Sequence, residues 1–270
     1  RRGQNPTVNQ VLGKSSMSQH LATKEPPLGR FEQHDLEHVN AQLADASPIE
    51  ILEWAEQHFP GKVTFATGFG PEGCAIIDMI ARAGLTIDVF TLDTGLFFGE
   101  TYDLWTRLEA HTGLTIRPVR PAFDLQQQAK HYGEDLWKND PDLCCTIRKV
   151  MPLQDALEGF DVWASAIRRD QTPERANTPI VAYDPKFNLL KISPLAKWSD
   201  EQVWEYIRRF DVPFNPLHEE GYPSIGCRPC TSPVKPGESA RAGRWRSHNK
   251  TECGLHTKGT KERANRLRII

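Results

Sequence analysis

The chain lacks any long hydrophobic run, and none of its apolar stretches approaches the ~20 residues that a membrane span requires. It also lacks a strong net charge, because 33 Lys and Arg residues nearly balance 35 Asp and Glu residues and leave a net charge of −2. Bulk binding of nucleic acid needs a clear positive excess. We therefore expect neither a membrane span nor a nucleic-acid partner. The chain also shows no internal repeat.

Acidic residues are missing from the beginning of the chain, where none precedes Glu25. The segment 1–30 also shows no clear apolar period, so it is predicted to be a disordered lead-in. Met17 would then be the natural first residue, and a basic, serine-containing targeting peptide is the alternative. We expect one α/β domain over residues 31–236 and a mobile tail over residues 237–270. The excess of Lys and Arg after Gly226 fits either a solvated surface or recognition of an anionic ligand.

Cysteine is scarce, with six residues in 270, but its spacing is informative. Cysteine-rich secreted domains are short, so a reducing cytoplasm is the expected compartment. Cys144 and Cys145 are adjacent, and their side chains diverge too far to pair with each other. Cys227 and Cys230 form a C-x-x-C turn, which brings two sulfurs to one side. Four thiolates from these two segments suit an iron–sulfur cluster or zinc, whereas burial as small hydrophobic residues is the plainer alternative.

Strands and helices alternate along the middle of the chain. Expected strands end near Ala66, Leu92, Val119 and Ala166. Five helices are expected, in chain order. The first begins at the capping box of Ser47 and the second after the loop Thr67–Gly73, and the others begin at Glu100, Leu143 and Ser199. Such alternation implies right-handed crossovers and a single, mainly parallel twisted sheet flanked by helices. Ligands bind beyond the carboxyl ends of the strands in such sheets.

Three motifs follow the carboxyl ends of expected strands: Thr67–Gly73, Leu92–Gly95 and Ala166–Arg169. The first is a glycine loop before a helix, which lets backbone N–H groups approach an anion. It has neither the Lys of a P-loop nor the glycine spacing of a dinucleotide fingerprint. Each motif on its own is also compatible with an ordinary turn. Cys74 follows in an apolar helix and is expected in the core.

Several motifs together resemble one family. They are Cys144-Cys145-Thr146-Ile147-Arg148-Lys149, Ile225-Gly226-Cys227-Arg228-Pro229-Cys230-Thr231, Glu252-Cys253-Gly254-Leu255-His256, Leu92-Asp93-Thr94-Gly95 with Glu100-Thr101-Tyr102, and Arg168-Arg169-Asp170-Gln171 with Arg175-Ala176-Asn177. This set is similar to the assimilatory adenylyl-sulfate (APS) reductases, over about residues 45–257. The related 3'-phosphoadenylyl-sulfate (PAPS) reductases share the Glu-Cys-Gly-Leu-His segment but lack the four paired cysteines.

The resemblance implies an ATP-pyrophosphatase-like (adenine nucleotide hydrolase-like) fold and a [4Fe–4S] cluster on Cys144, Cys145, Cys227 and Cys230. It implies that Cys253 attacks APS, and that thioredoxin or a glutaredoxin-like donor releases sulfite from the Cys253 S-sulfonate, with AMP as the other product. The enzyme would serve sulfate assimilation and cysteine biosynthesis, and we expect a homo-oligomer. The implied substrate-binding residues are Thr67, Gly68, Phe69, Gly70, Leu92, Asp93, Thr94, Lys149, Arg168, Arg175, Arg241 and Arg244.

Other functions remain open from the sequence. The chain could reduce PAPS, or both nucleotides. An ATP-pyrophosphatase enzyme of tRNA thiolation also joins this fold to cluster cysteines, but it should carry a Ser-Gly-Gly-x-Asp-Ser loop that Thr67–Gly73 is not. A non-catalytic zinc protein would explain four cysteines and leave Cys253 without a role.

Overall fold

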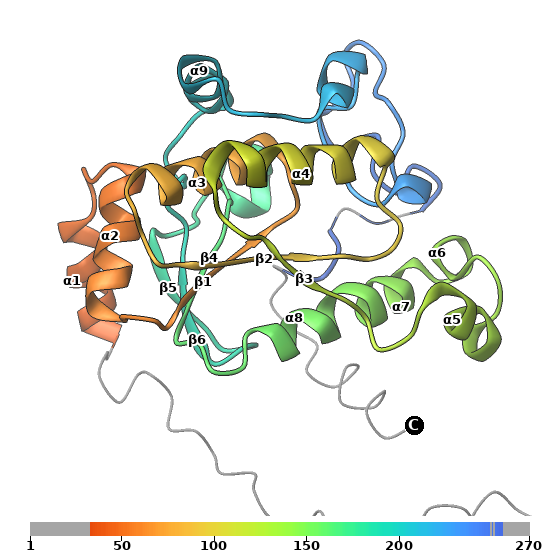
Figure 1. The fold of residues 1–270 in the computed structure, drawn as a ribbon, viewed down its shortest axis with the longest axis horizontal. Helices are drawn as coiled ribbons and strands as arrows, with labels where there is room; N and C mark the ends of the chain where they lie inside the picture. Colours follow the sequence, from red (N-terminus) through yellow and green to blue (C-terminus); the bar gives the residue numbers. More distant parts are fainter. Residues whose placement is uncertain (1–32, 249, 251, 256–270) are drawn as a thin grey trace, which may run out of the picture.

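The computed structural model describes residues 33–248, 250 and 252–255 of the chain (Figure 1). The predicted lead-in 1–30 and the end of the tail, with His256, lie outside the described residues. A six-stranded sheet in the order β3-β2-β1-β4-β6-β5 forms the centre. Its strands are β1 Val63–Thr67, β2 Asp88–Leu92, β3 Arg117–Val119, β4 Val162–Ala164, β5 Val181–Asp184 and β6 Leu189–Ile192.

All neighbouring strands are parallel except the edge pair β5 and β6, which is antiparallel. The sheet confirms the predicted α/β class and its mainly parallel order. The β5–β6 hairpin was not predicted, because both strands are short and their turn, which includes Pro185, looks like an irregular loop. Asn188 closes this turn with a left-handed φ of 57°.

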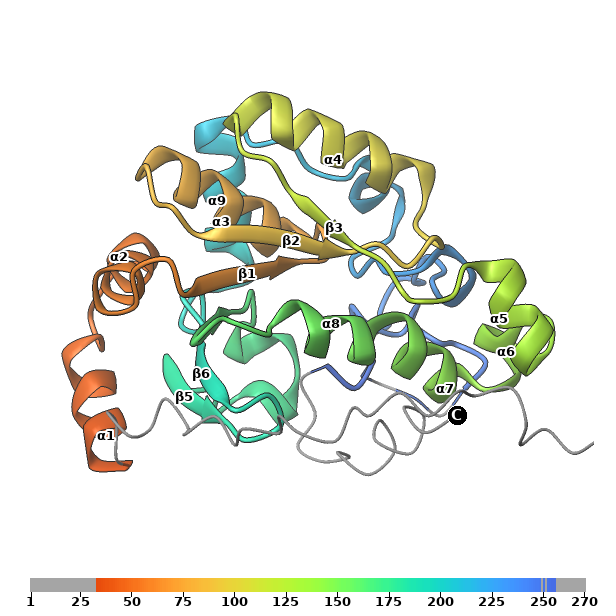
Figure 2. The same cartoon turned by 60° about the horizontal axis from the view of Figure 1, so that its bottom comes forward.

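Helices cover both faces of the sheet. Figure 2 shows α3 (Pro71–Arg82), α4 (Gly99–Thr112) and α9 (Asp200–Phe210) on one face and α8 (Met151–Ala156) on the other. The remaining helical segments are α1 Gln33–Gln42, α2 Pro48–His58, α5 Leu125–Tyr132, α6 Leu136–Asn139, α7 Pro141–Cys145 and the short turns η3 Thr146–Val150, η4 Arg169–Gln171, η5 Pro173–Arg175, η6 Pro216–Glu220 and η7 Arg228–Cys230. None of the described helices is long and apolar enough to span a bilayer.

Local sequence explains where the main helices begin. The Ser47 hydroxyl accepts a hydrogen bond from the Glu50 backbone N–H, and the Glu50 carboxylate accepts one from the Ser47 N–H, as the sequence predicts. Ser199 and Gln202 form the same capping box at α9. The apolar side of α3, including Ile76, packs into the main core with the sheet.

The expected helix over 143–157 is correct in extent but not in form. It consists of α7, a π-helical turn at Thr146–Val150 and α8, which continue one another. Pro152 lies in the first turn of α8, where it cannot donate a hydrogen bond to the Arg148 carbonyl and would crowd it. The wider π turn accommodates this proline, and such turns are frequent at functional sites. It carries Arg148 and Lys149 directly after the cysteine pair.

The order of the strands in the sheet changes direction between β1 and β4. From β1 the chain adds β2 and β3 on one side and β4 and β6 on the other. In open α/β sheets this reversal leaves a crevice at the carboxyl ends of the two central strands. Thr67 ends β1 there, and the segment that follows β4 leads to Arg168.

Candidate active site

The glycine loop lies at this crevice and leads into α3. Its backbone is held by the Thr67 hydroxyl, which accepts a hydrogen bond from the Phe69 N–H at 3.0 Å. Phe69 has a φ of 59° and a buried ring that packs on Trp105 and Phe97. The side chain of Phe69 therefore anchors the loop in the core. The backbone of Thr67, Gly68 and Gly70 is the part that remains to receive a ligand.

The predicted substrate contact Asp93 has three hydrogen-bond partners within the protein. Its carboxylate accepts hydrogen bonds from the Tyr102 hydroxyl at 2.8 Å, from Arg120 Nε at 3.0 Å and from the Gly95 N–H at 3.1 Å. Burial and the bond to Asp93 raise the pKa of Tyr102 to about 12. Asp93 thus shapes the loop that follows Leu92.

Thr94 joins this loop to the C-x-x-C segment. The Thr94 Oγ1 and Cys227 Sγ atoms lie 3.3 Å apart, and the Arg228 N–H donates to the Leu96 carbonyl at 2.7 Å. Two segments distant in sequence are therefore fixed to each other beside the cysteines.

The four predicted ligand cysteines line one pocket. Its lining residues are Leu96, Trp137, Pro141, Cys144, Cys145, Arg148, Lys149, Cys227 and Cys230. Burial, followed by the neighbouring cysteines, raises the pKa of Cys144 to about 12 and that of Cys230 to about 11. Burial also acts to raise the pKa of Cys227, but Lys149 and the Thr94 hydroxyl outweigh it and the pKa is lowered. One thiolate is thus favoured by the protein alone.

The donor set of this pocket is compatible with an iron–sulfur cluster, because four thiols line it. Among the described residues, no three Cys, His, Asp or Glu side chains are grouped as a single-ion site requires. The thiolates of a zinc site all lie about 2.3 Å from the metal. In a [4Fe–4S] cluster each thiolate binds a different iron, so the four sulfurs stand further apart. Here four buried or half-buried thiols line one pocket, with Arg148 and Lys149 beside them.

The two cations after the cysteine pair have different surroundings. Arg148 is buried, and its guanidinium donates to the Thr94 carbonyl at 2.6 Å and to Gln128 Oε1 at 3.0 Å. Lys149 Nζ lies 3.9 Å from Cys145 Sγ. Burial acts to lower the pKa of Lys149, but the thiolates of Cys227, Cys145 and Cys253 outweigh it and raise it. Arg148 therefore braces the site, and Lys149 brings a positive charge to the thiols.

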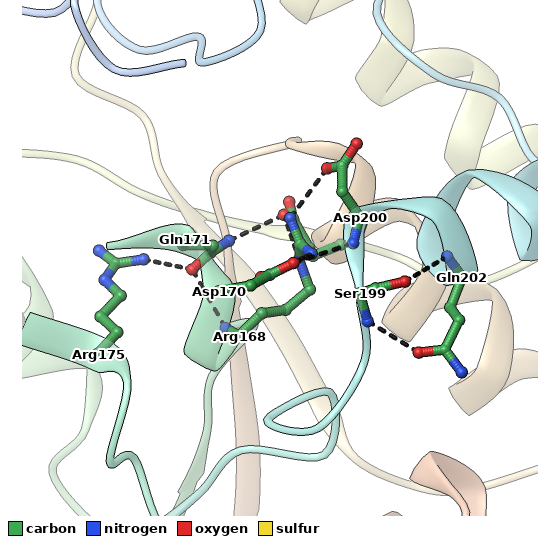
Figure 3. A network of polar contacts seen from close by, with 8 residues as sticks. Arg168, Asp170, Gln171, Arg175, Ser199, Asp200 and Gln202 are labelled. Carbon is green, nitrogen blue, oxygen red and sulfur yellow. Dashed lines mark hydrogen bonds and ion pairs between the residues drawn. The ribbon is translucent and has the colours of Figure 1, made fainter. Parts of the chain in front are cut away.

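Arg168 lies at the crevice but is bound by carboxylates of the protein. Its guanidinium donates to Glu72 at 3.0 Å, to Asp170 at 2.7 Å and to Asp200 at 2.9 Å (Figure 3). With its charge matched by these acids, Arg168 joins the start of α3 to that of α9. Arg175, also in Figure 3, donates to Gln171 in the same network.

Arg241, Arg244 and Trp245 lie on the segment that leads towards the end of the chain. Arg244 donates to the Ser224 hydroxyl and the Ile225 carbonyl, both at 3.2 Å, and its guanidinium carbon lies 4.6 Å from the centre of the Trp245 indole. Lys149 and Lys250 also stand by this ring, at 5.9 Å and 5.5 Å. Trp245 is 2% exposed and holds a left-handed φ of 46°, an uncommon strain for a bulky residue. Three cations, Arg244, Lys149 and Lys250, thus lie around the buried indole near the cysteine pocket.

Cys253 lies against the domain near this pocket. Its thiolate contributes to the shifts in pKa of Cys145, Lys149, Lys186 and Arg241, so all four lie within its electrostatic reach. Leu255, two residues on, packs on the core cluster around α8. The candidate nucleophile, the ligand cysteines and the predicted cations Lys149 and Arg241 are therefore brought together. Leu92 and the glycine loop lie at the strand ends.

Comparison with known proteins places the chain in a family. The model of the phosphoadenosine phosphosulfate reductase domain matches residues 62–233. The chain belongs to this family.

Two curated relatives match this chain over nearly their full length. One is the adenosine 5'-phosphosulfate reductase of Shouchella clausii, 42% identical over 233 residues, with 85% of this chain and 97% of the relative covered. Another is adenosine 5'-phosphosulfate reductase 1 of Bacillus subtilis, 44% identical over 77% of this chain and 90% of the relative.

A family structure also resembles the fold. The phosphoadenylyl-sulfate (PAPS) reductase of Candida auris, solved as a phosphate complex, matches with a TM-score of 0.67 at 32% identity. The match covers 75% of this chain and 98% of that one. The family and the fold predicted from the sequence are thereby confirmed.

Sequence reasoning missed several residues that this member of the family places at the site. Lys186 and Lys191 belong to the unpredicted β5–β6 hairpin, and both lie near the tail. Glu252 was noticed only as part of a motif, although its carboxylate binds two arginines. A Lys in a turn and a Glu before a Cys carry no special sequence signal. Only the fold shows their partners.

Lys191 predicts a specific dependence of stability on pH. Burial, followed by Arg175 and Lys186, lowers its pKa to about 8, although Asp184 opposes the shift. Between about pH 8 and the ordinary lysine value near 10.5, the unfolded chain binds more protons, so the free energy of unfolding rises with pH. Lys191→Met removes this contribution, which is at most about 1.4 kcal/mol per pH unit. Urea unfolding at pH 8 and pH 10 should show a smaller rise for Lys191→Met than for wild type and Lys197→Met; equal rises would contradict the assignment.

Gly243 predicts a large steric effect where the C-x-x-C segment pairs with the tail. A Cβ at this position would lie 2.0 Å from the Ser232 carbonyl oxygen, and Ser232 N–H donates to the Gly243 carbonyl at 2.9 Å. We expect Gly243→Ala to separate the two segments and destabilise the fold by about 1–3 kcal/mol. Gly99→Ala, where a Cβ meets no atom within 4 Å, is the control. Thermal unfolding measures both, and a Gly243→Ala protein as stable as Gly99→Ala would refute the close approach.

Proposed function

We propose that the chain is an adenylyl-sulfate reductase that converts APS to sulfite and AMP for sulfate assimilation. The supporting observation is the placement of Cys253 within electrostatic reach of Lys149 and Arg241, beside the pocket of four cysteines. The APS reductases of Shouchella clausii and Bacillus subtilis share more than two fifths of their aligned residues with it. The enzyme class is an oxidoreductase acting on sulfur.

The proposed reaction has two steps. The Cys253 thiolate attacks the sulfur of APS, an S–S bond forms, the bond between sulfur and the bridging phosphosulfate oxygen breaks, and AMP leaves with that oxygen. A thioredoxin thiolate, or that of a glutaredoxin-like donor, then attacks the Cys253 sulfur and sulfite leaves. The second thiol of the donor resolves the mixed disulfide, so the donor supplies both electrons and departs oxidised.

The cations of the site interact with the sulfate of APS and with the negative charge that develops as the sulfur is transferred. Lys149 and Arg241 offer charge-assisted hydrogen bonds to the sulfate and stabilise the negative charge that gathers during transfer. The glycine loop and Leu92–Thr94 would hold the nucleotide through backbone groups. Cys144, Cys145, Cys227 and Cys230 would hold a [4Fe–4S] cluster, which supplies an anionic, structurally fixed centre beside Lys149. The chain's own thiol carries the substrate sulfur.

The remaining parts of the proposal concern the setting of the enzyme. We place it in a reducing cytoplasm as a homo-oligomer, with residues 31–236 as the binding domain and 237–270 as the tail that carries Cys253. Light scattering of the purified protein tests the oligomer directly.

Sulfite release from APS and from PAPS, side by side with reduced thioredoxin, tests the function. We expect turnover of APS and much slower turnover of PAPS. The reason is that this chain has the four paired cysteines of the APS reductases, which the PAPS reductases lack. PAPS is the second candidate substrate, since the Candida auris neighbour is a PAPS reductase. Equal turnover would establish a dual enzyme, and no sulfite from either nucleotide would refute the proposal.

A further inference from the structure

The residues on either side of Cys253, Glu252 and Gly254, are each held by contacts to the rest of the domain, termed anchors here. On one side, the Glu252 carboxylate accepts hydrogen bonds from Arg175 Nη2 at 2.8 Å and Arg241 Nη2 at 3.4 Å, one on each oxygen. The three side chains are 16%, 13% and 23% exposed, so solvent screens these ion pairs less than pairs on the open surface. Glu252 is thus held from two directions.

On the other side, Lys186 Nζ donates to the Gly254 carbonyl. Gly254 holds a left-handed φ of 85°, which favours glycine and turns the chain immediately after Cys253. Beyond the turn, Leu255 packs against the core cluster that includes Leu153. Backbone, turn and apolar contact therefore fix the residue after the thiol.

The partners of these anchors are themselves braced. Arg175 Nη1 donates to Gln171 Oε1 at 2.5 Å, and Gln171 Nε2 donates to Glu72 Oε1 at 2.8 Å. Glu72 lies in the first turn of α3, after the glycine loop, and also binds Arg168. Figure 3 shows Arg175 reaching out from this network. A series of hydrogen bonds thus connects the start of α3, after the glycine loop, to Glu252.

We propose that Glu252 and Lys186 are positioning residues that form a two-point clamp on Cys253. The clamp fixes the backbone on both sides of the thiol, so that the sulfur is held at the site before the nucleotide reacts. Thiol transfer needs close, aligned approach, and a displacement of about 1 Å can cost about a hundredfold in rate. The inference rests on the proposed function for its kinetic part, whereas the docking of Cys253 can be measured without any substrate.

The first measurement is alkylation of Cys253 by iodoacetamide in the intact protein. Modified Cys253 is quantified in the tryptic peptide 251–258, which contains no other cysteine. Rates are measured over a series of pH values and compared on the plateau, where the rate no longer changes with pH and therefore reports access. We expect Glu252→Gln and Lys186→Met to react about fivefold or more faster than wild type, because each releases one anchor. Lys186→Arg, which keeps a donor, should stay close to wild type.

Matched controls lie elsewhere in the chain. Glu238→Gln removes a carboxylate that pairs with Arg246 at 2.8 Å, and Lys197→Met removes an amine that donates to the Ala44 carbonyl. Both break the same kinds of contact away from Cys253. Neither should alter its alkylation rate.

The second measurement is the single-turnover formation of the Cys253 S-sulfonate from APS, together with AMP affinity. We expect Glu252→Gln and Lys186→Met to slow transfer about 10- to 100-fold while the AMP dissociation constant changes less than about threefold. Unchanged alkylation in both variants would overturn the clamp, whether or not the protein reduces APS. Faster alkylation with unchanged transfer would equally overturn its positioning role. Absence of S-sulfonate in wild type with the expected alkylation pattern would refute the proposed function and leave the clamp standing.

Discussion

Cys253→Ser is expected to abolish sulfite formation from APS while the protein keeps its fold and binds AMP. A hydroxyl near neutral pH is a far poorer nucleophile than a thiolate, so turnover should fall by at least about a thousandfold. Cys253 lies outside the pocket that Cys144, Cys145, Cys227 and Cys230 line, so iron content should stay unchanged. Sulfite release, AMP binding and iron analysis are the three measurements.

The covalent intermediate gives this prediction a direct readout. Wild-type protein incubated with APS alone should gain about 80 Da, the mass of SO3 added to a nucleophile, and reduced thioredoxin should remove it. The mass should map to peptide 251–258. Substantial activity in Cys253→Ser, or an adduct on Cys74 or a pocket cysteine, would show that another residue attacks.

Cys227→Ser is expected to cost the protein its iron. Cys227 is buried, lies beside Thr94, and is the pocket thiol whose pKa is lowered, because Lys149 and Thr94 outweigh the effect of burial. Purified without oxygen, wild type should hold about four irons and four acid-labile sulfides per chain, and the variant far less. Since cluster binding adds to the stability of the folded state, the melting temperature should fall as well.

Cys74→Ala is the matched control for this loss. Cys74 is fully buried in α3, and burial raises its pKa. It should be a core residue, so the variant should lose some stability and keep its iron. One tightly bound zinc in colourless wild-type protein, or full iron in Cys227→Ser, would contradict the cluster assignment.

The central strands and helices could be predicted because their signals are local. Val63–Thr67 is a compact β-rich segment before a glycine loop, and Ser47 with Glu50 forms a capping box without help from distant residues. The cysteine spacing likewise carried the idea of a common pocket. These features depend on neighbours within a few positions.

The rest depended on partners far away in sequence. Arg168 and Asp93 are predicted substrate contacts, and the fold adds partners that the sequence does not show, because charged groups of other segments bind both. The π turn arises where Pro152 meets a continuing helix, and the β5–β6 hairpin gains its stability from pairing with β4. Tertiary contacts decided these cases over local propensity.

The pairing of the C-x-x-C segment with the residues around Gly243 has a consequence for the lifetime of the protein in a cell. Thr231 and Arg244 form a β-bridge, and Trp245 N–H donates to the Cys230 carbonyl at 2.9 Å. Because these contacts tie the C-x-x-C segment to the residues around Gly243, loss of the proposed cluster at Cys230 would also loosen the stretch between them and expose it to proteases. We therefore expect protein that has lost the proposed cluster to be cleaved in this stretch faster than protein that holds it.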